Sequence, residues 1–207
     1  MIHFQVEMQD LTKIEAALGM TRDKSKIVLR SAINNAAKQI EKTMVKETKG
    51  RYVFKRDIKS SNSIKKATTR NMQAIITVRG TANELYDFQV RPQTYYPGSK
   101  GAPSWIKARG KKSGKLQRIA ARIAARMGSG GDQYKGFVVK YHSGHLAFAE
   151  RVPGKKMRSD PKKEAIETLY SLATPKMEEV VYMDEIHEGV MDLLEKSIET
   201  QIYRYMR

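Results

Sequence analysis

The sequence contains no cysteine. This excludes disulfide bonds, thiolate metal sites and a cysteine nucleophile. Apolar runs are also short, and none approaches the roughly 18 residues that a membrane-spanning helix needs. The first ten residues, MIHFQVEMQD, lack the basic-then-apolar order of a secretory signal peptide. From these absences we expect a soluble protein of the cell interior with no membrane partner.

Motifs for catalysis and nucleotide binding are missing as well. The chain has neither the G-x-x-x-x-G-K-[ST] nor the G-x-G-x-x-G pattern. His142 and His145 form an H-x-x-H with Glu150 five residues on, but typical metal sites need three or four ligands. We therefore expect no catalytic residues, no metal, no cofactor and no enzymatic activity. A metal-dependent nuclease, with carboxylates brought together from distant positions, stays open as an alternative.

Positive charge is what the sequence has in excess. The 39 Lys and Arg residues outnumber the 22 Asp and Glu residues, which gives a formal net charge of +17. Residues 1–50 carry +3, residues 51–160 carry +18 and residues 161–207 carry −4. A basic body with an acidic end fits binding to nucleic acid, binding to an acidic partner, or head-to-tail attraction between copies of the chain.

The most basic stretch, residues 107–127, holds eight basic residues and no acidic one. Its second half has helical spacing, which predicts a basic helical insertion or loop over residues 107–131. Arginines at four-residue steps on one helix face fit contact with phosphates, with an acidic partner, or with solvent alone. The residues proposed for such a contact are Lys111, Lys112, Lys115, Arg118, Arg122 and Arg126.

Apolar periodicity predicts a strand and then a long helix in the N-terminal part. Ile2, Phe4 and Val6 alternate with polar residues, as in a half-buried strand. Helical spacing follows from about Thr21 to Gly50. The apolar stripe of this helix comprises Ile27, Leu29, Ala32, Ile33, Ala36, Ala37, Ile40 and Met44. Its alanines let another backbone approach closely.

Short strand-like segments fill the middle of the chain. Residues 72–79 and 86–90 are rich in β-branched and aromatic residues, and 105–107 is a shorter candidate. Residues 136–141 and 146–151 predict a hairpin around a His-Ser-Gly-His turn. The proline- and glycine-rich residues 91–104 predict a long loop, in which Tyr95, Tyr96 and the following Trp105 are candidate subunit contacts.

A second long helix is predicted at the C-terminal end. Pro175 follows a short apolar patch and is expected to break the chain there. Residues 183–207 then carry apolar residues at four-residue steps, namely Ile186, Val190, Leu194, Ile198 and Ile202, flanked by Leu193, Tyr203 and Tyr205. We expect Leu194, Ile198 and Ile202 to contact a partner subunit. The order of elements predicts one α+β domain over residues 1–207, an antiparallel sheet packed by the two long helices.

The succession of these motifs resembles the minor tail protein Z family of tailed bacteriophages and prophages. The resemblance runs from about Ala32 to the end of the chain. It rests on the segments AINNAA (32–37), RYVFKRDI (51–58), QAIITVR (73–79), FQVRP (88–92), the hairpin GFVVKYHSGHLAFAERVPGKKM (136–157), IETLYSLATPKM (166–177) and the closing helix. The long basic stretch 107–127 departs from the family's pattern.

The resemblance implies a virion structural protein of the tail or neck. Such a protein completes the tail tube at its head-proximal end and assists head–tail joining by subunit contacts, first in the host cytoplasm and then in the virion. Its implied partners are the tail tube, the tail terminator and the head–tail connector, with a homo-oligomeric ring in the virion. Non-specific DNA contact is a secondary expectation, and a nucleic-acid-binding protein acting through Lys107–Arg126 is the alternative function.

Overall fold

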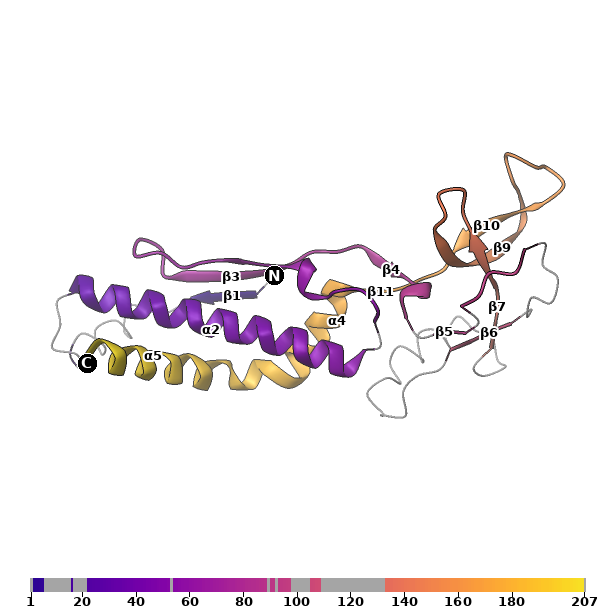
Figure 1. The fold of residues 1–207 in the computed structure, drawn as a ribbon. Coiled ribbons are helices and arrows are strands. Elements are labelled where there is room, and N and C mark those ends of the chain that lie inside the picture. Colours follow the sequence, from indigo (N-terminus) through magenta and orange to yellow (C-terminus); the bar gives the residue numbers. More distant parts are fainter. Residues whose placement is uncertain are drawn as a thin grey trace. The chain divides into compact units, whose positions relative to one another are not determined.

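The fold is taken from a computed structural model, which describes residues 2–5, 16, 22–52, 54–88, 90–91, 93–97, 105–108 and 133–206. The predicted α+β class is confirmed: antiparallel sheets combine with a long N-terminal and a long C-terminal helix (Figure 1). One domain over residues 1–207 stays a prediction; in the structure the chain divides into two compact units. We call them the helical unit (Met1–Thr48, Ile58–Gly80 and Pro175–Arg207) and the strand unit (Lys49–Asp57 and Thr81–Thr174).

The helical unit contains a three-stranded antiparallel sheet of order β1-β3-β2. Its strands are β1 (Ile2–Gln5), β2 (Asn62–Lys65) and β3 (Gln73–Val78), with a 3-10 turn η1 (Lys59–Ser61) before β2. Ile2 lies opposite Ile76, and Ile64 lies opposite the same residue from the other edge. The predicted strands at the start of the chain and near residue 75 are therefore present and neighbouring.

Helix α2 (Arg22–Arg51) lies along this sheet (Figure 1). The buried apolar residues of α2 are those of the predicted stripe, except that Ile27 is half-buried and that Val28 and Val45 join the core; the polar Ser25, Thr48 and Arg51 are buried as well. Asp23 in the first turn and Lys49 and Arg51 in the last are placed as the helix dipole favours. Asn34 fixes α2 to the β2–β3 connection, since its Nδ2 donates to the Ala67 carbonyl (3.1 Å) and its Oδ1 accepts from the Ala67 N–H (2.8 Å).

The C-terminal helix predicted for residues 183–207 is present in a different form. Helix α4 (Thr174–Val181) comes first and continues through a π-helical turn η5 (Tyr182–Ile186) and a 3-10 turn η6 (His187–Gly189) into α5 (Val190–Met206). Pro175, expected to break the chain, instead lies in the first turn of α4. A proline is tolerated there because the first helical N–H groups have no partner within the helix.

Helix α5 runs beside α2, and small residues allow the contact (Figure 1). Ser197 Oγ donates to the Ala32 carbonyl at 2.9 Å, so the alanine face of α2 is approached closely, as predicted. A four-residue step overshoots one helical turn by about 40°, so three steps from Val190 to Ile202 rotate the stripe by about 120°. Val190 is accordingly buried, whereas Leu194, Ile198 and Ile202 are half-buried and the polar Ser197 and Gln201 are buried instead.

The described part of the strand unit contains sheets of only two or three strands. The first has the order β10-β9-β8, the second β5-β6-β7, and the third pairs β11 with β4. Their bounds are β4 (Ala82–Glu84), β5 (Val90–Arg91), β6 (Trp105–Ala108), β7 (Gln133–Lys135), β8 (Phe137–Lys140), β9 (Leu146–Lys156), β10 (Glu164–Thr168) and β11 (Tyr170–Ala173). The predicted hairpin is confirmed, with Phe137 opposite Ala149 and Lys140 opposite Leu146.

One predicted strand of this unit is wrong. Residues 86–90 were expected to be extended, but Leu85–Asp87 form the 3-10 turn η2, and only Val90–Arg91 pair as β5. Leu85 is buried and its N–H donates to the Leu169 carbonyl (2.8 Å), while the Phe88 N–H closes the turn on the Leu85 carbonyl (3.1 Å). These hydrogen bonds to distant and local carbonyls override the alternating pattern.

Candidate protein-binding groove

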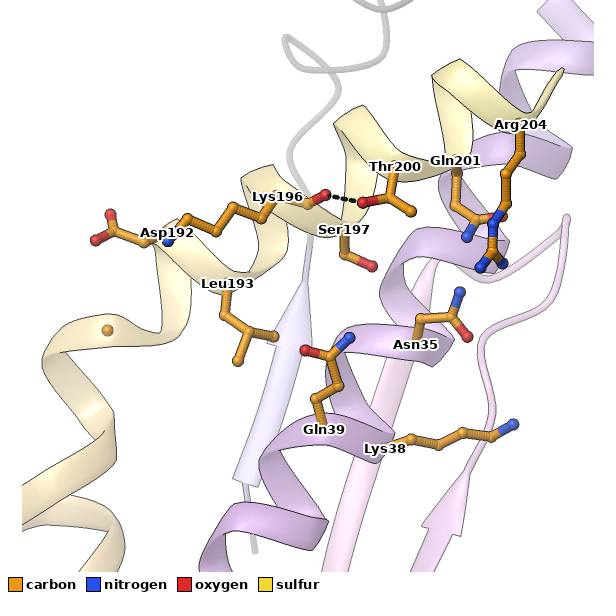
Figure 2. A pocket seen from close by; sticks show the side chains of 11 residues that line it. Asn35, Lys38, Gln39, Asp192, Leu193, Lys196, Ser197, Thr200, Gln201 and Arg204 are labelled. Atoms are coloured by element: carbon orange, nitrogen blue, oxygen red, sulfur yellow. Dashed lines mark hydrogen bonds between the residues drawn. The ribbon is translucent and has the colours of Figure 1, made fainter. Parts of the chain in front are cut away.

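A groove of about 760 Å³ lies between α2 and α5 in the helical unit (Figure 2). Its lining comes from two segments that are 150 residues or more apart in the sequence. The α2 side contributes Asn35, Lys38 and Gln39; the other side contributes Gly189, Asp192, Leu193, Lys196, Ser197, Thr200, Gln201 and Arg204. Most of these side chains are polar, because the apolar stripe of α5 rotates away from α2 toward its C-terminal end.

Hydrogen bonds hold the two helices together along the groove. Besides the Ser197 contact with Ala32, Ser31 Oγ donates to Gln201 Oε1 at 3.0 Å. Thr200 Oγ1 donates to the Lys196 carbonyl of its own helix at 2.7 Å (Figure 2). The Ser197 and Ser31 contacts join α5 to α2 and fix the register of the two helices, whereas the Thr200 contact lies within α5.

The groove is suited to recognition by shape and charge. Lys38, Lys196 and Arg204 bring three positive charges, and Asp192 brings one negative charge. Ser197 and Thr200, the hydroxyl groups of the lining, both donate to backbone carbonyls. A serine or threonine nucleophile needs a neighbouring base to accept its proton. Among the described lining residues no such pair is formed, and the arrangement supports binding of a polar, net acidic surface.

Exposed apolar side chains lie on the helices that form the C-terminal part of this unit. Met191 is 62% exposed, Tyr203 60% and Met183 59%; Tyr205 is also exposed. Large apolar side chains that the fold leaves in water are typical of surfaces that bind another protein. Sequence reasoning noted Tyr203 and Tyr205 only as residues flanking the stripe, and it passed over Met183 and Met191.

The residues predicted as interface contacts belong to two different units. Leu194, Ile198 and Ile202 are half-buried on α5 and belong to the helical unit. Tyr95 is exposed and Tyr96 half-buried, and both belong to the strand unit. Trp105 begins β6, where only the backbone is described. Of the basic helical insertion predicted for residues 107–131, Lys107 and Ala108 end strand β6, and residues 109–131 lie outside the described residues. The predicted basic contacts lie there too, namely Lys111, Lys112, Lys115, Arg118, Arg122 and Arg126.

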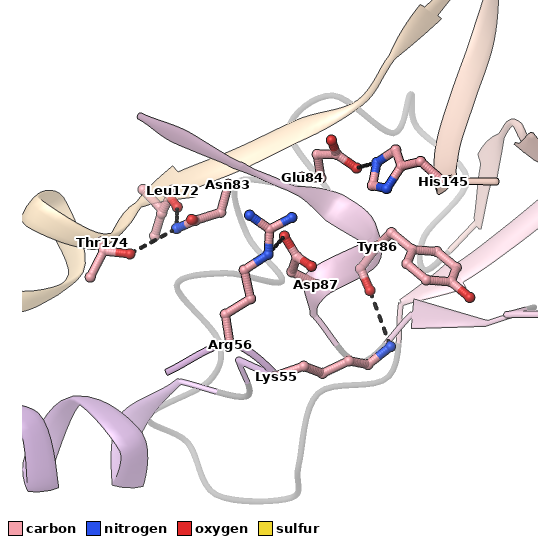
Figure 3. A network of polar contacts seen from close by, with 9 residues as sticks. All are labelled: Lys55, Arg56, Asn83, Glu84, Tyr86, Asp87, His145, Leu172 and Thr174. Carbon is pink, nitrogen blue, oxygen red and sulfur yellow. Dashed lines mark hydrogen bonds and ion pairs between the residues drawn. The ribbon is translucent and has the colours of Figure 1, made fainter. Parts of the chain in front are cut away.

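Of the two histidines His142 and His145 in the strand unit, His145 has a structural role (Figure 3). Gly144, with φ of +84°, lets the turn close, and the Tyr141 N–H donates to the His145 carbonyl at 2.8 Å. His145 Nε2 then lies 2.8 Å from Glu84 Oε2. Within the described part of the chain, no three His, Cys, Asp or Glu side chains lie together as a metal site would require.

Further polar contacts fix the segment after α2 to η2 in the same unit (Figure 3). Arg56 Nε lies 2.9 Å from Asp87 Oδ2, and Lys55 Nζ donates to the Tyr86 carbonyl at 3.1 Å. Partial burial lowers the pKa of Lys55, and the nearby Asp87 carboxylate opposes this by raising it. These contacts join the segment after α2 to η2, next to the packed rings of Phe54 and Phe88 (centroids 5.2 Å apart), so we assign the cluster a structural role.

Glu178 is a buried carboxyl group in α4 of the helical unit. Asn62 Nδ2 donates to its Oε2 at 2.9 Å, and no partner within hydrogen-bonding distance is described for Oε1. Burial raises the pKa of Glu178 to about 7; the Asn62 hydrogen bond lowers it and the Glu41 charge raises it further. The folded protein therefore favours the neutral form of this side chain.

Comparison with protein-family models, with curated proteins and with solved structures finds no match. The search for membrane spans likewise finds, in the described residues, no helix that is both long and apolar enough to cross a bilayer. Assignment of a function therefore depends on the site geometry and on the resemblance of the sequence motifs.

Proposed function

We propose that this protein is a structural component of a tailed-phage or prophage virion, of the minor tail protein Z type. It acts at the head-proximal end of the tail, in tail completion and head–tail joining, by binding other subunits. The tail tube, tail terminator and head–tail connector are its proposed partners. Catalysis has no part in this role.

The observation that carries the proposal is the surface of α5. This helix lines the polar groove and also exposes Met191 and Tyr203, each by about three fifths. Exposed apolar side chains beside polar and charged residues are typical of a surface that binds another protein. The element order supports the same proposal, since α2, β3, the β8–β9 hairpin and the closing helix are the elements on which the family resemblance rests.

Charge asymmetry supports a ring of subunits as the assembled form. The strand unit has 22 Lys and Arg against 8 Asp and Glu, whereas the segment Pro175–Arg207 has 4 against 8. Opposite charges at different parts of one chain favour a heterologous contact, in which one subunit's basic surface meets its neighbour's acidic surface. Such contacts repeat around a closed ring.

The gene context gives the first test, because a tail-completion gene lies among tail tube, terminator and tape-measure genes. The decisive experiment deletes the gene from its phage or prophage and examines lysates by negative-stain electron microscopy. We expect unjoined heads and tails and a large loss of infectious titre, restored by the gene supplied in trans. A normal titre of joined particles from the deletion strain would disprove the proposal.

The surface of α5 is tested separately by complementation. A Met191→Glu/Tyr203→Glu variant places charges at two exposed positions and leaves the core intact, so it should fold, as circular dichroism will check, and fail to restore titre. The matched control is Glu195→Gln/Glu199→Gln on the same helix, where both side chains are exposed and polar. If both variants restore titre equally, α5 is not the contact surface.

A further inference from the structure

The hairpin that joins β9 to β10 carries a dense group of exposed positive charges. Between residues 155 and 163, Asp160 is the one acidic residue. The five basic residues of this tip are Lys155, Lys156, Arg158, Lys162 and Lys163, and all five are exposed. This group lies outside the basic stretch 107–127 that the sequence analysis singled out.

A β-bulge sets the hairpin apart from the regular sheet. Glu164 pairs with Lys156 and Ile166 with Arg151, so β9 advances five residues where β10 advances two. The extra residues include Pro153, which has no N–H to donate, and Gly154, whose φ of +78° suits glycine. A Cβ at Gly154 would meet no atom within 4 Å, so the backbone conformation, not space, calls for glycine.

Hydrogen bonds close the tip into a defined loop. The Met157 N–H donates to the Lys163 carbonyl, and the Lys163 N–H donates to the Asp160 carbonyl, both at 3.0 Å. Asp160 Oδ1 accepts from the Lys162 N–H at 3.1 Å, and its Oδ2 lies 2.9 Å from Lys163 Nζ. The one carboxylate is thus used inside the loop, and four cationic side chains beside it have no ion pair among the described contacts.

The composition of the tip distinguishes between kinds of partner. Protein interfaces are enriched in aromatic residues and depleted in lysine at their centres. The tip has four lysines and no aromatic residue, so it offers neither an apolar anchor nor a surface on which bases could stack. Closely spaced lysines instead match the regular negative charge of a nucleic-acid backbone, where neutralising phosphates releases counterions.

We propose that the β9–β10 tip, residues 155–163, binds the phosphate backbone of duplex nucleic acid without sequence preference. A two-stranded β-ribbon is narrow enough to enter the major groove of B-DNA, which allows phosphates of both strands to be reached. The proposal is independent of the tail assignment, since it concerns a different unit from the α5 surface and needs no other phage protein.

Fluorescence anisotropy with a labelled 20-base-pair duplex of arbitrary sequence tests this on the full chain, over a range of salt concentrations. The test variant replaces Lys155, Lys156, Arg158 and Lys162 by Gln, and keeps Lys163 because it pairs with Asp160. Each phosphate contact contributes about 0.9 to the slope of log K against log salt. We expect the slope to fall in magnitude by up to about 3.6 and binding near 0.1 M salt to weaken at least tenfold.

A matched control removes the same charge elsewhere. It replaces Lys24, Lys42, Lys65 and Arg70 by Gln, all exposed in the helical unit. Binding by the control should stay within about twofold of the unaltered protein if the tip is the contact. Equal losses in the two variants would attribute binding to net charge and overturn the proposal.

Two further arms decide between the tip and its alternatives. Arg118→Gln/Arg122→Gln/Arg126→Gln removes the charges predicted to bind DNA from the sequence. If this variant loses binding and the tip variant does not, the proposal is wrong. The other arm is a competition with a glutamate-rich peptide that carries the same charge as the duplex. If this peptide displaces the duplex at equal charge concentration, and if its binding depends on the same four residues, an acidic protein is the partner and the nucleic-acid assignment is overturned.

Discussion

The two units differ in how they are held together and in their charge. The helical unit is built on long helices with a continuous apolar core, and its sequence has 17 Lys and Arg against 14 Asp and Glu. The strand unit has short sheets, a network of polar contacts and a net charge of +14. Self-repulsion of like charges opposes compact folding. The strand unit therefore depends more on individual buried anchors, and the helical unit is the better scaffold for subunit contact.

The largest effect should come from removing the main anchor of the strand unit. Phe148 is fully buried and its ring centroid lies 5.4 Å from that of Tyr86. Phe148→Ala removes a large side chain from a core that cannot close around the cavity, and we expect a loss of about 3–5 kcal/mol of unfolding free energy. Urea unfolding measures this loss, and hydrogen exchange of the amides in each unit shows which unit is affected.

The corresponding change in the helical unit is Ile40→Ala, which empties a fully buried position of α2. We expect a cost of about 2–5 kcal/mol there. If the units unfold separately, each substitution speeds exchange in its own unit and leaves the other unchanged. Equal acceleration in both units from either change would show one cooperative fold and break the comparison.

Glu178 makes the stability of the helical unit depend on pH. Its pKa is about 7 in the folded protein, against about 4.5 in an unfolded chain. Below pH 4.5 the group is neutral in both states and costs nothing. As pH rises toward 7 the unfolded chain ionises first, so stability falls, and above pH 7 the loss stays constant at about 3 kcal/mol.

Glu178→Gln keeps an oxygen that accepts from Asn62 and removes the ionisation. We expect the variant to be more stable than the unaltered protein at pH 8 and nearly equal to it at pH 4. Thermal unfolding at a series of pH values gives this comparison. Glu179→Gln is the control, since Glu179 is exposed on the same helix. A pH profile that keeps its slope in Glu178→Gln would refute the assignment.

Asn83 tests whether polar contacts carry part of the stability of the strand unit. It is buried, and its Nδ2 donates to the Leu172 carbonyl at 2.7 Å and to Thr174 Oγ1 at 3.3 Å (Figure 3). Asn83→Ala leaves that carbonyl without this donor, and we expect a loss of about 2 kcal/mol. Thr81→Ala, at an exposed neighbouring position, should change stability by less than about 0.5 kcal/mol. Similar losses of unfolding free energy in both variants would show that the polar contacts of Asn83 do not stabilise the strand unit.

The sequence predicts those parts of the fold in which one segment decides its own structure. The apolar stripe of α2 repeats from Ile27 to Met44, and the β8–β9 hairpin has a glycine at the turn; both elements are found in the structure. Strands β10 and β11 were missed because EAIET and YSLA are short and are defined by their pairing with β9 and β4. The 3-10 turn η2 was missed for the same reason, since its anchor is the Leu169 carbonyl.

The candidate sites are less accessible from the sequence. The groove joins polar residues of α2 with polar residues of α5, and no local pattern relates Lys38 to Arg204. The exposure of Met191 could have been predicted from the sequence, because this residue lies beside the apolar stripe of the helix and not on it. The basic tip also has a signal, namely five basic residues in nine, although the stretch 107–127 holds more basic residues in total, eight in 21. Counting charge finds both stretches, and the structure adds that hydrogen bonds close the tip at residues 155–163.

The smallest expected effect concerns that closure. The Lys163 side chain and the Lys162 N–H hold the pKa of Asp160 below its usual range, so the carboxylate is charged at neutral pH. Asp160→Ala removes an acceptor from an exposed loop, and global stability should change by less than about 0.5 kcal/mol. The Lys162 amide should exchange faster, because it loses its partner, while amides of β8 stay protected. If the Lys162 amide exchanges at an unchanged rate, the Asp160 carboxylate does not hold the loop at residues 155–163 in its shape.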